Sequence, residues 1–222
     1  MAEVQAIKEN RRGRLSHLAV EFLIVFVLLP TAFRLRPFPI PALPVLWVVA
    51  AYCYSVLRRQ LQFESQTLWN RHALLASWRP IVARFVPAAA ALTLAVRVFA
   101  PGLFLNMPRR YPLFWALIMV LYPLLSVVPQ TLVYRAFLFE RYGEIFRGEA
   151  ALILASGATF AWLHIALRNW IAPFLTLPAG LLFAWRYART RSVAASAFEH
   201  ALYGCAVFTL GLGAYFYTGA AR

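Results

Sequence analysis

The chain consists largely of apolar runs of about 15 to 25 residues, long enough to cross the hydrocarbon core of a bilayer. Helices and closed β-barrels are the only folds that satisfy backbone hydrogen-bonding groups in lipid. Barrel strands are about ten residues long and alternate apolar with polar side chains, whereas these runs are continuously apolar. Of all residues, 62% are apolar and 14% charged, against ~25% charged in soluble domains. The sequence therefore predicts an all-α, polytopic transmembrane helical bundle.

We expect seven to eight spans. Seven apolar runs are the candidates, at residues 17–33, 40–57, 81–100, 111–129, 150–167, 170–187 and 192–217. Residues 130–147 either continue the preceding helix beyond a kink at Pro129 or return as an eighth crossing. Residues 58–80 mix arginine with leucine and tryptophan, which predicts an interfacial amphipathic helix. Since no repeat or linker interrupts the chain, we expect residues 1–222 to form a single integral-membrane domain.

The formal net charge of +14 does not indicate nucleic acid as a partner, because the basic residues punctuate apolar segments and form no basic block interleaved with aromatics. Arginine concentrates in the predicted loops of one side, around 58–84, 135–147 and 186–191. This bias favours a cytoplasmic N-terminus. The compact chain and its arginine-dominated basic residues are typical of a bacterial inner-membrane protein. Cys53 and Cys205 lie in apolar segments and are expected to be packed thiols.

Two histidines and a glutamate lie inside the apolar runs, where ionisable groups are costly and indicate a functional site by default. They are His164, His200 and Glu199. Each histidine could instead be a polar residue that hydrogen-bonds between helices. Adjacent residues on a helix point about 100° apart, so Glu199 could face an arginine from another helix instead of the site that His200 lines.

Three helices can bring the polar residues to one depth. If residues 130–147 are helical and antiparallel to the next span, Gln130 and His164 both lie roughly 25 Å from the turn between them. Arg135 follows Gln130 by a little over one turn. His200 lies roughly 15 Å beyond the later turn at Arg189–Arg191. We therefore expect these residues to line one pocket.

Three short segments carry a family resemblance. They are QTLVYR at 130–135, FAWLH at 160–164 and HALYG at 200–204. In this order and spacing they resemble the Glu-Glu-x-x-x-Arg, Phe-x-x-x-His and His-x-x-x-Asn motifs of the CPBP family. These are the CAAX-protease and bacteriocin-processing, or type II CAAX prenyl endopeptidase-like, intramembrane proteases. The likeness covers roughly residues 110–210, within a family-like core of about 110–217.

The chain departs from the family pattern at three positions. The family's first glutamate, which the resemblance implies would activate the attacking water, is Gln130, and the second is Thr131. The family's asparagine, which helps to hold the oxyanion, is Gly204. Because glutamine cannot accept a proton, Glu199 is the nearest replacement base, and the histidines would polarise water and bind the carbonyl oxygen.

These considerations give two sets of candidate residues. The catalytic set is His164, His200, Glu199, Gln130 and Arg135. The substrate-binding set is Phe160, Asn169, Tyr134 and Gly204. Asn169 could instead cap the next helix, and Phe160 could be a core aromatic. No cofactor or metal is expected. Zinc is the alternative, although two histidines and one carboxylate are a thin ligand set.

The leading hypothesis is an endopeptidase that hydrolyses a peptide bond in a membrane-embedded cavity. Its partners would be a peptide or membrane-protein substrate and the lipid bilayer. The alternative is a catalytically inactive relative, or pseudoprotease, that binds a membrane or lipidated partner. A transporter is disfavoured because no inverted repeat or paired half-helices are present. CAAX processing itself is not expected in a bacterial chain, and the sequence predicts neither the substrate nor the oligomeric state.

Overall fold

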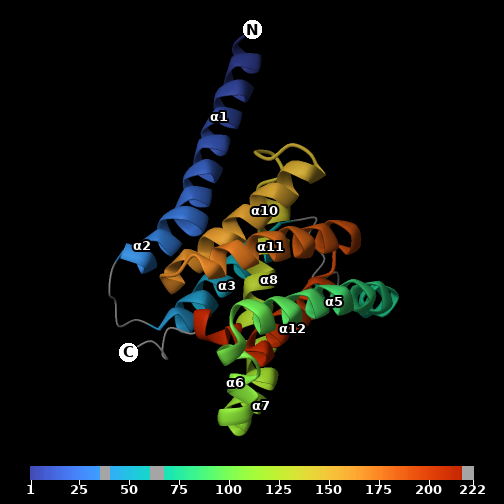
Figure 1. Ribbon diagram of the computed structural model, residues 1–222. Helices are drawn as coiled ribbons and strands as arrows, with labels where there is room; N and C mark the ends of the chain where they lie inside the picture. Colours follow the sequence, from blue (N-terminus) through green and yellow to red (C-terminus); the bar gives the residue numbers. More distant parts are fainter. Residues whose placement is uncertain (36–40, 61–67, 217–222) are drawn as a thin grey trace.

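The computed structural model describes residues 1–35, 41–60 and 68–216, and the regular elements in these ranges are all helical (Figure 1). Within them, five helices are long and apolar enough to cross a membrane, at Glu9–Leu35, Arg71–Phe99, Pro112–Arg141, Glu149–Leu167 and Val193–Leu210. A shorter apolar helix spans Ala42–Arg58. The all-helical membrane fold is confirmed. The total of seven or eight spans stays a prediction.

The first helix continues across three segments, α1 (Ala2–Phe22), the π-helical η1 (Leu23–Leu28) and α2 (Leu29–Leu35). The N-terminal part of α1 extends away from the other helices (Figure 1). Further along, Glu21 connects α1 to two other helices. Its carboxylate accepts hydrogen bonds from Arg141 at 3.0 and 3.1 Å and from the Tyr52 hydroxyl at 3.0 Å. Tyr52 lies on α3 (Ala42–Arg58), which packs against the central helix.

The central helix is continuous from Pro112 to Arg141. It consists of α7 (Pro112–Tyr122), η3 (Pro123–Val127), α8 (Val128–Thr131), η4 (Leu132–Phe137) and α9 (Leu138–Arg141). A proline has no N–H to donate, and π-helical turns such as η3 and η4 accommodate the lost hydrogen bonds. Residues 130–141 therefore continue the preceding helix, which is the first of the two alternatives expected for residues 130–147. Residues 142–148 form the turn before the next helix.

The interfacial helix expected over residues 58–80 falls in part outside the described residues. Residues 61–67 lie outside the described residues, and 71–80 are the first turns of α5 (Arg71–Phe99). Asn70 caps this helix, because its side-chain oxygen accepts from the backbone N–H of Ala73 at 2.9 Å. A short linker, η2 (Pro101–Leu103) and α6 (Asn106–Arg110), leads from α5 to the central helix.

The C-terminal half contains α10 (Glu149–Leu163), η5 (His164–Leu167), α11 (Ile171–Thr190), α12 (Val193–Leu210) and η6 (Leu212–Tyr215). The helices α10 and α11 pack closely because two glycines face each other. A Cβ on Gly157 would lie 2.5 Å from Leu181, and a Cβ on Gly180 would lie 3.0 Å from the ring of Phe160. This close packing holds Phe160 against α11. The helix α11, predicted as a span over 170–187, is not among the five long apolar helices.

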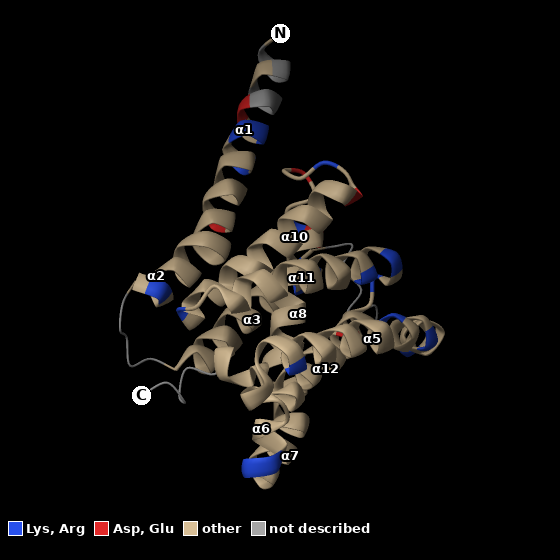
Figure 2. Cartoon of the chain, in the orientation of Figure 1, with Lys and Arg blue, Asp and Glu red and all other residues tan. Residues whose placement is uncertain are grey.

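Lysine and arginine gather toward the ends of α5, α6 and α11 (Figure 2). Several arginines that were assigned to loops of one side lie within helices, among them Arg84, Arg135 and Arg186. Arg84 stacks over Trp185 with its guanidinium 4.6 Å from the ring centroid, and Arg135 and Arg186 are buried. The arginine bias thus rests on fewer residues, and the cytoplasmic N-terminus stays a prediction. Both cysteines are free thiols, as predicted.

Candidate active site

The two histidines converge on one aromatic ring. His164 begins η5 at the end of α10, and His200 lies within α12. The imidazole centroid of His164 lies 4.8 Å from that of the Phe160 ring, and the centroid of His200 lies 5.2 Å from it. The sum of these two distances limits the separation of the imidazoles to about 10 Å. Two helices that follow different turns therefore bring both rings to a single cluster, which we call the histidine cluster.

A backbone hydrogen bond orients His164. Its Nδ1 lies 2.8 Å from the carbonyl oxygen of Phe160. Because a carbonyl can only accept, Nδ1 must carry the proton of the neutral ring, which leaves the lone pair on Nε2. Among the described residues, no protein group is hydrogen-bonded to this Nε2. His164 thus presents a free proton acceptor.

His200 is held by aromatic side chains. Its ring stacks on Phe183, with centroids 4.8 Å apart and an interplanar angle of 22°. Its Nε2 lies 3.3 Å from the hydroxyl of Tyr122, which comes from the central helix. The residue is only 5% exposed. Contacts on several sides therefore restrict the orientation of this imidazole.

Arg135 is a buried cation beside the histidine cluster. Its Nη1 donates to the carbonyl oxygens of Tyr134 and Ser156, at 3.1 and 3.3 Å, and to the Ser156 hydroxyl. Its guanidinium also lies 4.9 Å from the Phe160 ring centroid. Within the described part of the chain, no carboxylate pairs with it, and Glu140 pairs instead with Arg191 at 2.9 Å. Arg135 therefore keeps its positive charge available to the cluster.

The residues at the positions of the two family glutamates make neutral contacts. The side-chain nitrogen of Gln130 donates to the Ser126 hydroxyl at 2.7 Å, and its oxygen is buried without a partner among the described residues. A buried hydrogen-bond acceptor without a donor destabilises the folded state, and a donor that reaches it reduces this cost. The hydroxyl of Thr131 donates to the carbonyl of Val127 at 2.7 Å. Neither residue supplies a carboxylate.

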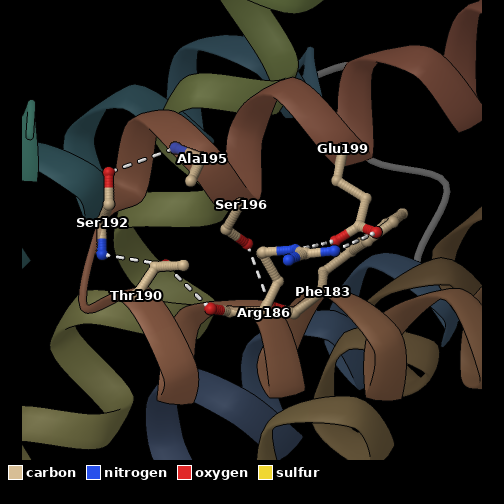
Figure 3. A network of polar contacts seen from close by, with 7 residues as sticks. All are labelled: Phe183, Arg186, Thr190, Ser192, Ala195, Ser196 and Glu199. Atoms are coloured by element: carbon tan, nitrogen blue, oxygen red, sulfur yellow. Dashed lines mark hydrogen bonds and ion pairs between the residues drawn. The ribbon is translucent and has the colours of Figure 1, made fainter. Parts of the chain in front are cut away.

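Glu199 lies in an ion pair with Arg186 of α11 (Figure 3). Its two oxygens accept from Nε and Nη2 of Arg186, at 2.9 and 3.3 Å. The carboxylate is completely buried. The neighbouring Ser196 hydroxyl donates to the Phe183 carbonyl at 3.0 Å, which further binds α12 to α11. The geometry therefore gives no support to Glu199 as a replacement base. It favours the alternative that Glu199 faces an arginine from another helix, because adjacent helical residues point in different directions.

The candidate substrate-binding residues have mainly structural contacts. Phe160 and Tyr134 are 1% and 3% exposed, and their rings pack edge to face at 5.7 Å. Asn169 caps α11, since its side-chain oxygen accepts from the N–H of Ala172 at 2.9 Å. Its side-chain nitrogen donates to the carbonyl of Tyr215 at 2.8 Å. Gly204 faces Tyr122.

The sequence analysis did not identify several residues that complete these clusters. They are Tyr122, Ser126, Ser156, Phe183 and Arg186. Two of them had a signal in the sequence. Ser126 precedes Gln130 by one helical turn, and a buried glutamate requires a cation such as Arg186. In the described ranges, no three His, Cys, Asp or Glu side chains come together as metal ligands.

The three motifs lie within the part of the chain that matches a known protein family. Residues 112–206 match the family described as type II CAAX prenyl endopeptidase Rce1-like. The resemblance predicted from the three motifs is thereby confirmed, and the matched region contains both the histidine cluster and the Arg186–Glu199 pair. No curated protein and no solved structure gives a significant match.

Proposed function

We propose that the protein is an intramembrane endopeptidase in which His164 is the general base. The observation that carries this proposal is the convergence of two imidazoles on Phe160, with the lone pair of His164 Nε2 free. An imidazole whose Nδ1–H is held by a carbonyl is oriented to accept a proton at Nε2. The family is one of peptidases, which agrees with this chemistry.

In the proposed reaction, Nε2 of His164 accepts a proton from water as the water oxygen attacks the carbonyl carbon of the scissile peptide bond. The carbonyl π electrons move to oxygen, which gives a tetrahedral oxyanion. When the C–N bond breaks, its electron pair goes to nitrogen, and the imidazolium returns the proton to the leaving amine. The products are a carboxylic acid and an amine. The substrate must be extended at this bond, because a helical backbone hides the carbonyl.

Three further residues have roles in this proposal. The uncompensated charge of Arg135 favours the negative charge that develops in the transition state. The unpartnered side-chain oxygen of Gln130 accepts a hydrogen bond from the attacking water and holds it in place. His200 donates a hydrogen bond to the substrate carbonyl oxygen. The reaction is metal-free in this scheme, since Glu199 is paired with Arg186 and the described residues offer the two imidazoles no other carboxylate co-ligand.

The proposal places the protein in a bacterial inner membrane with its N-terminus in the cytoplasm. The long apolar helices support integration in a membrane, and arginines at helix ends, including Arg58 and Arg189, support the orientation. The partners are the bilayer and a peptide or membrane-protein substrate, and nucleic acid is not a partner.

A cleavage assay tests the proposed function. The purified protein in proteoliposomes is given a library of membrane peptides in water enriched in ¹⁸O, and products are identified by mass spectrometry. Hydrolysis places one ¹⁸O atom in the new carboxyl group. His164→Gln is expected to abolish this product, whereas His72→Gln, at an exposed histidine, leaves it unchanged. Equal cleavage by the parent and His164→Gln would overturn the role of His164.

A second candidate function is a pseudoprotease that binds a membrane or lipidated partner. The specific observation in its favour is that, among the described residues, no carboxylate is paired with the histidine cluster, because Glu199 is paired with Arg186 and Gln130 and Thr131 are neutral. This function predicts that the parent binds peptides of the library without forming any ¹⁸O-labelled product. The same assay therefore separates the two functions.

A further inference from the structure

The phenol of Tyr122 fills the space that a side chain at position 204 would take. Tyr122 is the last residue of α7, and Gly204 lies one turn after His200 on α12. A Cβ built on Gly204 would lie 2.3 Å from the Tyr122 hydroxyl oxygen and 2.4 and 2.6 Å from its ring atoms Cε1 and Cζ. Real Cβ contacts are not that short, so any larger residue at position 204 would displace the phenol. The Tyr122 hydroxyl can therefore lie here because residue 204 is a glycine.

The same hydroxyl lies 3.3 Å from Nε2 of His200. The Tyr122 ring packs edge to face on Phe208, with centroids 5.1 Å apart, and this contact holds the phenol in position. Residues 200 and 204 share a helix face. A polar side chain at position 204 would therefore extend into the volume beside His200 that the phenol now occupies.

Resting on the proposed peptidase function, we propose that Tyr122 is a positioning residue that supplies the hydrogen bond which position 204 cannot make. Its O–H donates to Nε2 of His200, so the neutral imidazole carries its proton on Nδ1. That tautomer leaves Nδ1–H as the donor to the substrate carbonyl oxygen. The polar contact beside His200 therefore comes from the central helix and not from α12 itself.

Four variants test this role by activity. Tyr122→Phe removes only the hydroxyl, and we expect kcat to fall about tenfold with KM unchanged, the effect of losing one hydrogen bond. Tyr111→Phe, at an exposed tyrosine, is the matched control and leaves kcat unchanged. In a Tyr122→Leu background, Gly204→Asn adds an amide beside His200. The double variant should therefore be more active than Tyr122→Leu alone.

A spectroscopic measurement distinguishes this proposal from the proposed function. In protein labelled with ¹⁵N-histidine, Tyr122→Phe should shift the His200 ring nitrogen resonances and leave those of His72 in place. Unchanged His200 resonances, or unchanged kcat in Tyr122→Phe, would overturn the positioning role. A folded parent that cleaves nothing overturns the proposed function instead, and the resonances then still decide whether Tyr122 holds His200.

Discussion

Glu199 and His200 are adjacent in α12, yet they belong to two clusters of opposite character. The Arg186–Glu199 pair is electrostatically complete, because a bidentate ion pair satisfies both charges (Figure 3). The histidine cluster is incomplete. Beside it lies Arg135 without a carboxylate partner among the described residues, and the central helix also carries a Gln130 oxygen to which no described group donates. The Arg186–Glu199 pair joins α11 to α12, whereas the histidine cluster lies beside a cation that no described carboxylate pairs with.

The largest expected effect is on catalysis. His164→Gln should lower the cleavage rate by about 10²- to 10⁴-fold, the usual contribution of a general base. The unfolding temperature should stay close to that of the parent, because glutamine can still donate to the Phe160 carbonyl. Product formation per folded molecule, measured by mass spectrometry, checks this. A large fall in unfolding temperature at an unchanged rate would place His164 with the structural residues.

The second effect is on stability. Glu199→Gln leaves Arg186 buried without its counter-ion, and removing one partner of a buried pair costs about 3–5 kcal/mol. Replacing both partners, as Arg186→Met with Glu199→Leu, should recover most of that free energy, since apolar residues of similar size need no pairing. Unfolding of the parent, of Glu199→Gln and of the double variant in detergent gives the comparison. A double variant as unstable as Glu199→Gln would show that the pair has a further role.

A smaller effect connects packing to the histidine cluster. Gly180→Ala would place a Cβ 3.0 Å from the ring of Phe160, which both imidazoles contact. We expect a loss of about 1–3 kcal/mol from overpacking, together with a lower cleavage rate. Gly102→Ala is the control, because no atom lies within 4 Å of the added Cβ. Thermal unfolding and cleavage are measured for both. An unchanged cleavage rate in Gly180→Ala would separate Phe160 from the site.

The fold class followed from the sequence because lipid allows few alternatives, and continuous apolar runs exclude barrel strands. The path of residues 130–147 could not be predicted from the sequence. A proline at position 129 is compatible with a kink, a break or a continuous helix, and the choice depends on π-helical turns that leave no clear sequence pattern.

The candidate site was predictable in part. The depth of His164 and His200 depends on helix rise alone, which is why their convergence could be anticipated. The direction of Glu199 depends on how α12 is rotated against α11, and close contacts such as the Ser196 hydrogen bond set that rotation. Tyr122 had no signal, because a glycine at position 204 indicates only a missing side chain and not the distant residue that fills its place.

The most direct test compares the two neighbours on α12. The rate of peptide cleavage per folded molecule is measured for His200→Gln and for the Arg186→Met, Glu199→Leu double variant. The separation into two clusters predicts at least about a hundredfold loss for His200→Gln. It predicts a rate within about twofold of the parent for the double variant, as expected for independent sites. Loss of cleavage in the double variant, with His200→Gln unaffected, would contradict the account.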